Sequence, residues 1–423
     1  MQPSRGRFLL ILGIWATGGG YDRNVPITPP HLQCAAAVDR HADTRTAAWS
    51  VGEQLLEGLG GTPSLVMTVA SYHHAAALPE AMATIRDHLD GPSVVGVTSA
   101  GVLANGEEHH AGATLAALAI SGPGVRARSF AFDPTDGPPE AWSRPLIRSR
   151  LRPASPPRAI AVFADPFSSG SAALPEVFAG AAPPGTPLVG GLLTGGSQPG
   201  TNVMVTEDRV LNGGVVGFVL EGAIDATQIV AHSGRSVGPP MVVTDVSGGT
   251  VRGLSGRPAA ERLDEVVAQL PPADRERLAG RPLIGIAANA MQPVHGRGDF
   301  LLRPVATVDR VGGGLLVPGG VPRGATIRFQ VVDGDTERED LAMALDLANL
   351  DERPVRGLLA ASSIGRGPTL LGESGHDAAR IQARLGEIPA LGFVTAAEIA
   401  PIRNRPYLAG LGLSALALRS PHA

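Results

Sequence analysis

One pattern of hydrophobic and polar positions recurs three times along the chain. Each copy begins with a short, continuously apolar run, passes through a polar loop into a helical segment, and ends with two further apolar runs. Continuous apolar runs of this length are typical of strands that are buried on both faces. The pattern therefore predicts repeated strand–helix–strand–strand units, whose first strands lie at 65–70, 159–164 and 356–361 and whose helices lie at 78–89, 172–181 and 376–385.

A more strand-rich section separates the second copy from the third. Two apolar runs around Ser-Gly-Gly predict a hairpin at 241–254, and helical spacing follows at 259–269 and 337–350. The Pro- and Arg-rich stretch at 133–157 is expected to be a linker, and a softer boundary is expected near 235. We predict a mixed α/β (α+β) protein with layered sheets flanked by helices, divided into a tail at 1–40 and two domains at 41–235 and 236–423.

The N-terminal segment has a basic start and a short apolar run at 8–16. This run is too short to span a bilayer, and the residues after it make a poor cleavage site for a secretory signal. We interpret residues 1–40 as a disordered tail or a start codon placed too far upstream, with a secretory signal as the alternative. The expected location is cytoplasmic.

Composition excludes several classes of function. The chain has 423 residues, a net charge of −4 and only 4% aromatic residues, so it lacks the basic surface and stacking side chains of nucleic-acid-binding proteins. All its basic residues are arginine, which excludes a Schiff-base lysine or a P-loop lysine. We expect neither nucleic acid nor a membrane as a partner.

Several short motifs in the repeats resemble those of the FIST family. Ser-Ser-Ile-Gly-Arg-Gly at 362–367, with Gly-Phe at 392–393 and Glu-Ile-Ala-Pro at 398–401, is similar to the signature of its C-terminal domain. Gly-Val-Thr-Ser-Ala-Gly at 96–101 is similar to a motif of its N-terminal domain. The resemblance implies two sensory domains that bind a small ligand such as an amino acid.

This chain departs from the family pattern at four positions. Val97 and Ser363 stand where the family has cysteines, so no thiol chemistry can be carried over. Ala397 replaces a glycine, and Ser255 replaces an aspartate. The ligand of this chain can therefore differ from those of other members.

The strongest candidate ligand contacts lie in the C-terminal signature. Glycines let a ligand approach the backbone, and an arginine among them can hold a carboxylate or phosphate. An amino acid would suit Arg366 and Glu398 together, and the alternative is an internal ion pair in which Arg366 binds a neighbouring acid such as Glu398. The predicted ligand-binding residues in this region are Ser362, Ser363, Gly365, Arg366, Gly367 and Glu398.

Other candidates are weaker. Thr98 and Ser99 end a predicted strand, where their hydroxyl groups can bind a ligand or cap the turn. Ser363 with His376 as base is the one nucleophilic pair to consider. The histidine pairs at 73–74 and 109–110 favour solvated turns over a metal site, because adjacent residues on a strand point to opposite faces. We predict no cofactor, no metal and no assigned catalytic residue.

We therefore predict a stand-alone sensory protein that binds a small ligand, such as an amino acid or other small carboxylate, and signals through a separate partner protein. Two alternatives stay open. One is an enzyme that acts on a small anionic substrate through Arg366 with Glu398 or Ser363. The other is a protein–protein adaptor that binds no metabolite.

Overall fold

The computed structural model describes residues 31–422, apart from 233 and 293. The predicted tail at 1–40 therefore lies largely outside the described residues, but its last part is folded. Strand β1 (Gln33–Asp39) pairs along its whole length with a later strand, so the folded chain begins before residue 40. The expectation of a tail up to residue 40 is wrong for these residues.

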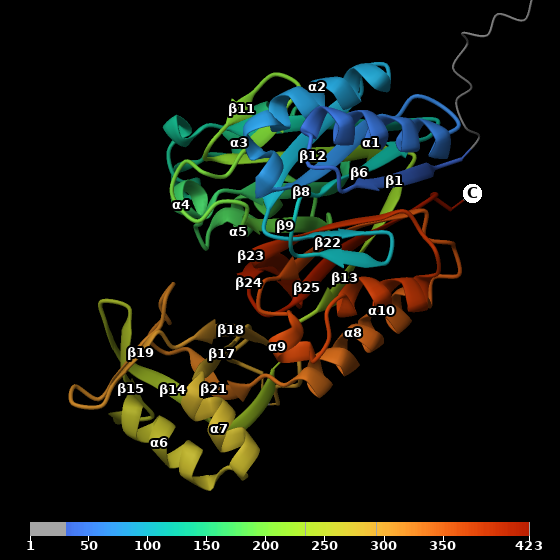
Figure 1. Cartoon of the computed structure of the whole chain (residues 1–423). Coiled ribbons are helices and arrows are strands. Elements are labelled where there is room, and N and C mark those ends of the chain that lie inside the picture. Colours follow the sequence, from blue (N-terminus) through green and yellow to red (C-terminus); the bar gives the residue numbers. More distant parts are fainter. Residues whose placement is uncertain (1–30, 233, 293, 423) are drawn as a thin grey trace, which may run out of the picture.

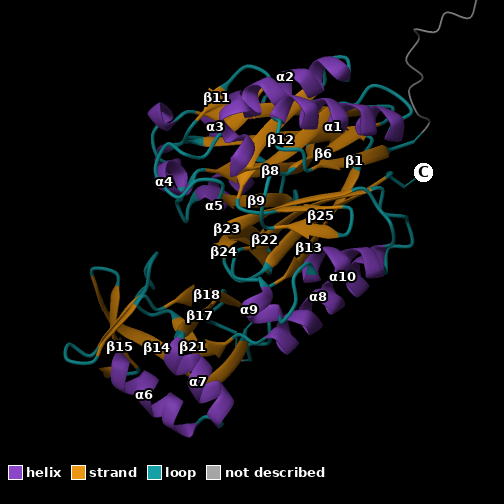
Figure 2. Ribbon diagram, in the orientation of Figure 1, coloured by secondary structure: helices purple, strands orange, loops and turns teal. Residues whose placement is uncertain are grey.

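The three predicted copies form three α/β units, and the predicted fold class is confirmed (Figures 1 and 2). Unit 1 contains β1 (Gln33–Asp39), α1 (Thr44–Gly58), β2 (Leu65–Ser71), α2 (Leu78–His88), β3 (Ser93–Ser99), the hairpin of β4 (Val102–Ala104) and β5 (Glu107–His109), and β6 (Leu115–Ser121). Unit 2 contains β7 (Val125–Phe132), α3 (Arg144–Leu151), β8 (Pro157–Ala164), α4 (Pro166–Ser169), α5 (Leu174–Ala181), β9 (Leu188–Leu193), the hairpin of β10 (Met204–Thr206) and β11 (Val210–Leu211), and β12 (Val215–Gly222).

Unit 3 repeats the same order around a large insertion. It contains β13 (Asp225–Ala231), α8 (Gly334–Ala348), β22 (Gly357–Ser363), α9 (Pro368–Leu371), α10 (His376–Leu385), β23 (Ala390–Ile402) with its hairpin partner β24 (Arg405–Ala409), and β25 (Leu413–Arg419). The strand that precedes the second helical segment has the same neighbours in every unit. Strands β2, β8 and β22 run parallel to β3, β9 and β23, and antiparallel to β6, β12 and β25, respectively.

The hairpins connect the units in a closed cycle. Hairpin β10–β11 of unit 2 pairs with β3 of unit 1, and hairpin β4–β5 of unit 1 pairs with β23 of unit 3. The second half of β23, which forms the hairpin of unit 3, pairs with β9 of unit 2. Each unit therefore supplies an edge strand to one neighbour and receives one from the other.

One hydrophobic core is shared by the three units. Helices α1 and α2 cover the outer face of unit 1, α3 and α5 cover unit 2, and α8 and α10 cover unit 3 (Figure 1). The inner faces of all three units meet in a single cluster that contains Met67, Phe163, Phe218 and Phe393. The ring centroids of Phe163 and Phe393 lie 5.3 Å apart, which places units 2 and 3 in direct contact.

Residues 235–331 form a separate lobe inserted into unit 3 (Figure 2). Its 8-stranded sheet has its own core against two helices. The lobe consists of β14 (Arg235–Ser247), β15 (Thr250–Leu254), β16 (Arg257–Pro258), α6 (Ala259–Gln269), α7 (Pro272–Gly280), β17 (Leu283–Ala287), β18 (Phe300–Pro304), β19 (Thr307–Asp309), β20 (Gly314–Leu316) and β21 (Thr326–Val331).

Two sequence-based boundaries need correction. The predicted linker at 133–157 contains α3, whose Ile147 and Leu151 are buried against unit 2. The predicted boundary near 235 falls where the chain leaves unit 3 for the lobe, but the chain returns to complete the 11-stranded sheet. A division at 235 therefore separates strands that belong to the same sheet.

Local geometry explains how the units close. The β4–β5 turn uses Asn105 and Gly106, both with positive φ, which is the conformation that a two-residue hairpin turn requires. Gly190 on β9 has φ +127°, and a Cβ there would lie 1.8 Å from the carbonyl oxygen of Val162. Only glycine fits at this contact between adjacent strands.

We predict that Gly190→Ala lowers the free energy of unfolding by about 3 kcal/mol, because it adds backbone strain and a steric clash in the core. Urea unfolding of the purified chain measures this loss. Gly280→Ala is the matched control, since a Cβ there meets nothing within 4 Å. Equal stability of Gly190→Ala and the unmodified chain would contradict this account of the β8–β9 contact.

Candidate functional site

The signature loop places Arg366 in a buried ion cluster. The loop follows β22, and the Arg366 side chain is 0% exposed. Its Nε lies 2.9 Å from Asp377 Oδ2, its Nη2 lies 3.0 Å from Asp377 Oδ1, and its Nη1 donates to Glu337. The guanidinium thus holds the start of α10, which carries Asp377, against α8, which carries Glu337.

Two further side chains complete this cluster. Ser362 Oγ donates to Asp377 Oδ2 at 2.8 Å, and His376 Nδ1 lies 3.1 Å from Asp377 Oδ1. Although burial opposes it, the Arg366 guanidinium holds the pKa of Asp377 well below its usual range. Burial raises the pKa of Glu337 to about 8 despite the nearby Arg366. The two carboxyl groups around the arginine therefore differ, because Asp377 favours its ionised form and burial shifts Glu337 toward its protonated form.

Glu398 lies in a second buried group and does not pair with Arg366. Its Oε1 accepts a hydrogen bond of 2.9 Å from the amide of Gly412 and lies 3.4 Å from His232 Nδ1. His232 comes from the segment between unit 3 and the lobe, and its ring is buried. The internal ion pair considered as the alternative for Arg366 is therefore present, but its acids are Asp377 and Glu337 and not Glu398. No sequence signal singled out His232, because a lone histidine after a strand has no distinctive spacing.

Ser363 and Glu398 bond to the same turn at 411–412, and in the described part of the chain the Ser363 side chain makes no hydrogen bond to the arginine cluster. Its Oγ accepts hydrogen bonds from the amides of Leu411 at 3.1 Å and Gly365 at 3.3 Å. The proposed base His376 bonds to Asp377 instead, and no hydrogen bond joins Ser363 to His376 among the described residues. The nucleophile–base pair considered from the sequence is therefore not assembled in this structure.

The two glycines of the signature loop shape its turn. A Cβ on Gly365 would lie 2.5 Å from the Leu411 side chain, whereas one on Gly367 would meet nothing within 4 Å. Gly365 thus permits close packing against the 411–412 turn, and Gly367 precedes α9.

Thr98 and Ser99 lie where the three units meet. Both side chains are buried, and Thr98 Oγ1 accepts from the amide of Val203 at 3.0 Å. Ser99 Oγ lies 2.7 Å from the Gly101 carbonyl oxygen and accepts from the amide of Val394 at 3.0 Å. In unit 2, Thr194 likewise donates to the Val394 carbonyl oxygen, at 2.6 Å. These hydroxyl groups join the units, and their predicted ligand contact stays a prediction.

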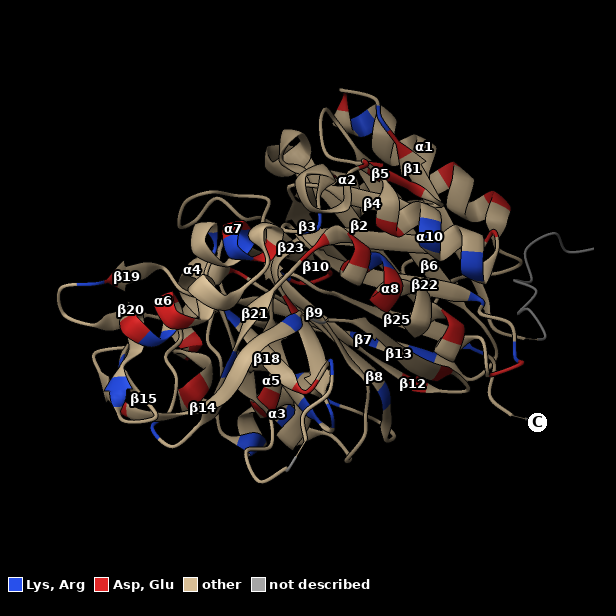
Figure 3. Cartoon of the chain, turned by 90° about the horizontal axis from the view of Figure 1, so that it is seen from below, with Lys and Arg blue, Asp and Glu red and all other residues tan. Residues whose placement is uncertain are grey.

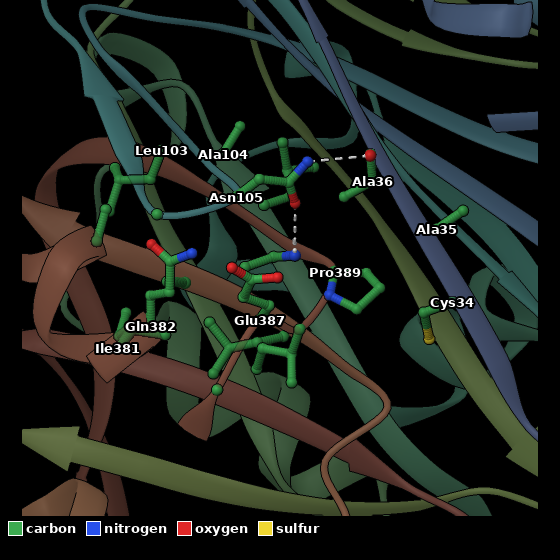
Figure 4. Close-up of a pocket in the computed structure, with 18 of the residues that line it drawn as sticks. Cys34, Ala35, Ala36, Leu103, Ala104, Asn105, Ile381, Gln382, Glu387 and Pro389 are labelled. Atoms are coloured by element: carbon green, nitrogen blue, oxygen red, sulfur yellow. Dashed lines mark hydrogen bonds between the residues drawn. The ribbon is translucent and has the colours of Figure 1, made fainter. Parts of the chain in front are cut away.

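A cavity of about 410 Å³ lies at the junction between unit 1 and unit 3 (Figure 4). Its walls are β1, the β4–β5 turn, α10 and the loop that leads into β23. Asn105 spans the junction, since its Nδ2 donates to the Ala36 carbonyl oxygen at 3.1 Å and its Oδ1 accepts from the Ala390 amide at 3.3 Å. Gln382 and Glu387 project toward this turn from α10 and the following loop.

The described lining of this cavity carries one acidic side chain and no cationic one. No arginine or histidine is among the described residues that line it, and Glu387 is its one carboxylate. Burial raises the pKa of the Cys34 thiol to about 12, so this side chain is neutral. The cavity therefore offers amide groups, backbone groups and one negative charge.

Helix α10 connects the ion cluster to the cavity. Its first turn carries Asp377, and the same helix supplies Ala378, Ile381 and Gln382 to the cavity wall. The amide of Ala378 also donates to Glu108 Oε1 at 3.0 Å, which ties α10 to the β4–β5 hairpin. The signature arginine thus positions a cavity wall without entering the cavity.

Comparison with known protein families identifies the family of this chain. The FIST N domain model matches residues 64–257, and the FIST C domain model matches residues 259–401. The chain therefore belongs to the FIST family, whose domains are general sensory domains, and the predicted resemblance is confirmed.

Mycobacterial proteins are similar over most of their length. The uncharacterized protein Rv0628c of Mycobacterium tuberculosis is 31% identical over 386 residues, which cover 90% of this chain and 98% of the relative. The uncharacterized protein Mb0898c of Mycobacterium bovis is 30% identical over 375 residues, covering 88% of this chain and 95% of the relative. Among the described residues, no helix has the length and apolar character needed to cross a membrane.

We predict that Arg366→Ala costs about 3–5 kcal/mol of folding free energy, because it leaves the Asp377 carboxylate buried without its cation. Arg366→Lys should rescue little of this loss, since lysine cannot bind both carboxylates through a planar fork. Chemical unfolding measures both variants, and Arg380→Ala on the exposed face of α10 is the control. A loss for Arg366→Ala no larger than that for Arg380→Ala would contradict a structural role.

A second prediction concerns pH. Between the ordinary glutamate pKa of 4.5 and about 8, the folded chain keeps a proton on Glu337 that the unfolded chain has lost. The resulting stability is complete below the unfolded pKa and decreases as pH rises through the folded pKa, by at most about 1.4 kcal/mol per pH unit. Unfolding measured from pH 5 to pH 8 should show a shallower decline for Glu337→Gln.

The control for this pH series is Glu373→Gln, which changes an exposed carboxylate. It should leave the decline unchanged. An identical decline for Glu337→Gln and the unmodified chain would show that Glu337 does not bind the additional proton.

Proposed function

We propose that this chain is a sensory protein that binds a small ligand in the cavity between α10 and the Asn105–Gly106 turn and signals through a separate protein. One observation carries the proposal. The family's signature arginine clamps α10, and the same helix forms one wall of the cavity. A ligand that moves α10 would therefore act directly on the buried cluster of Arg366, Asp377 and Glu337.

The lining residues favour a neutral ligand or one that carries an amine. Glu387 can pair with an ammonium group, and the amides of Gln382 and Asn105 can hydrogen-bond to polar oxygen atoms. An amino acid held through its amine fits this chemistry. A small carboxylate without an amine finds no arginine or histidine among the described lining residues, and Arg366 is already occupied by two carboxylates.

The route of the signal would run through α8. This helix packs against α10, and Asn349, which caps its C-terminal end, donates from Nδ2 to the Arg384 carbonyl oxygen at 2.8 Å. Its first turns carry Glu337, the second partner of Arg366. A shift of α10 would therefore reach the surface of unit 3 through two separate contacts.

A protein–protein adaptor is the second candidate function, and one observation favours it. Helix α8 exposes Met343 and Leu347, and Leu350 in the turn just after the helix is exposed as well; the three side chains are 66%, 69% and 76% accessible. The spacing of four residues places Met343 and Leu347 on one face of the helix. An adaptor that binds no metabolite would gain no stability from any small molecule, so the following experiment distinguishes the two functions.

We predict that at least one amino acid or other amine-bearing metabolite raises the melting temperature of the full chain. A ligand that binds only the folded state, at about 100 times its dissociation constant, adds roughly 2.7 kcal/mol of stability. The measurement is a thermal-shift panel of amino acids, polyamines, nucleosides and organic acids.

The matched variants locate the site. Gln382→Trp fills the cavity and should abolish the shift, whereas Ala383→Trp adds the same side chain to the exposed face of α10 and should retain it. The melting temperatures without ligand show whether each variant folds. A shift retained in Gln382→Trp, or no shift with any compound, would contradict the proposed ligand site.

A further inference from the structure

The cyclic arrangement of the units creates three related junctions. At each one, a hairpin turn and the first strand of one unit face the helix–strand loop of the next. At the junction of units 1 and 2, Glu207 of the hairpin turn fills the space. It accepts hydrogen bonds from Ser129 Oγ at 2.6 Å, Ser93 Oγ at 3.0 Å and the Val94 amide at 3.3 Å. The other two junctions contain cavities.

The junction of units 2 and 3 contains the larger cavity, of about 1280 Å³. Its walls are the β23–β24 turn, β13, the α5–β9 loop and α3. The first three of these correspond to the β4–β5 turn, β1 and the α10–β23 loop of the cavity in Figure 4. Gln228 of β13 crosses this junction and donates to the Leu188 carbonyl oxygen at 2.6 Å.

The charges in the two cavities are opposite. Four arginines and one glutamate line the larger cavity, which gives +4 − 1 = +3 in a chain whose net charge is −4. Arginine positions, blue in Figure 3, lie around α3 and α5. The five charged residues are Arg144 and Arg148 of α3, Arg403 and Arg405 at the β23–β24 turn, and Glu176 of α5.

Two of the arginines have no carboxylate partner in the described part of the chain. Arg144 and Arg148 are four residues apart on α3 and form none of the ion pairs there. Arg148 Nε donates to the Ala181 carbonyl oxygen at 3.2 Å, and the Arg144 guanidinium lies over Gly180. Like charges at this helical spacing cost stability, so an anion between them would recover it.

The other two arginines have carboxylate partners, so Arg144 and Arg148 supply the uncompensated positive charge of this cavity. Arg405 lies 3.2 Å from Glu176, but both side chains are more than half exposed, so the pair contributes little. Arg403 pairs with Asp299 of the lobe at 2.8 Å, and it extends from a turn in which its own φ is positive.

We infer that the cavity between α3 and the β23–β24 turn is a binding site for a small organic molecule that carries one or more phosphate groups. Guanidinium groups match phosphate oxygens through paired hydrogen bonds, and clustered arginines are the usual recognition device for this group. The volume accommodates a ligand of nucleotide size. This inference does not depend on the ligand site proposed above, because the two cavities share no charged lining residue.

Calorimetric titration of the full chain tests this inference. The probes are ADP, inorganic pyrophosphate and citrate, a polyanion without phosphate. ADP and pyrophosphate should bind, and added salt should lower the affinity of the chain for both compounds. The double variant Arg144→Gln/Arg148→Gln should weaken binding by more than about tenfold. The control Arg209→Gln/Arg323→Gln removes the same charge from exposed positions outside both cavities and should not change the affinity.

Each other outcome overturns the inference. If ADP and pyrophosphate do not bind, or if the cavity variant and the control variant lower the affinity equally, the cavity is not the binding site. If citrate binds as tightly as ADP, the site does not select for phosphate groups. Gln382→Trp should leave ADP binding unchanged, so that failure at one cavity is distinguishable from failure at the other. The substituted arginines on α3 are exposed, and the melting temperature of each variant verifies that it folds.

Discussion

The exchange of hairpins among the three units is the constraint on which the rest of this structure depends. Each hairpin covers a strand edge in a neighbouring unit, so no unit can bury its own sheet edge alone. The inner faces of the units share one core, which makes the exchange cooperative with core packing. The lobe at 235–331 is accommodated because it enters between two elements of unit 3 and leaves the cycle intact. Cavities form at two of the three junctions as a consequence of the same geometry.

The charged residue of the signature motif, Arg366, makes contacts that support the structure. Arg366 joins a strand end to two helices through Asp377 and Glu337, with all three side chains buried. Replacing such a cluster by apolar residues is often neutral for stability, so its value lies in fixing one arrangement of the helices. That role fits a sensory domain, in which a helix must have a defined position before a ligand can shift it.

The sequence predicted the repeated elements and the fold class because buried strands in this chain are continuously apolar. It missed β1, where small residues such as Ala35 and Ala37 look like part of a tail. It also missed α3, because the arginines that now line a cavity resembled a solvated linker. Pairing between units has no local signal, since an apolar strand does not specify which edge it meets.

The same limit applies to the candidate site. Arg366 was identified from its motif, but its partner Glu337 lies 29 residues upstream on a helix whose pattern indicated only an amphipathic surface. His232 and the cavity at Asn105 arise from contacts between distant segments. A single sequence contains no spacing rule that would bring those segments together.

Hydrogen–deuterium exchange on the full chain, with and without a stabilising metabolite, tests the central claim most directly. The account predicts slower exchange in the β4–β5 turn at 103–106 and in α10 and its following loop at 378–391, which form the walls of the cavity. It also predicts slower exchange at the start of α8, which is connected to α10 through Arg366. Protection confined to other segments, with α10 unchanged, would contradict a sensory role for this cavity.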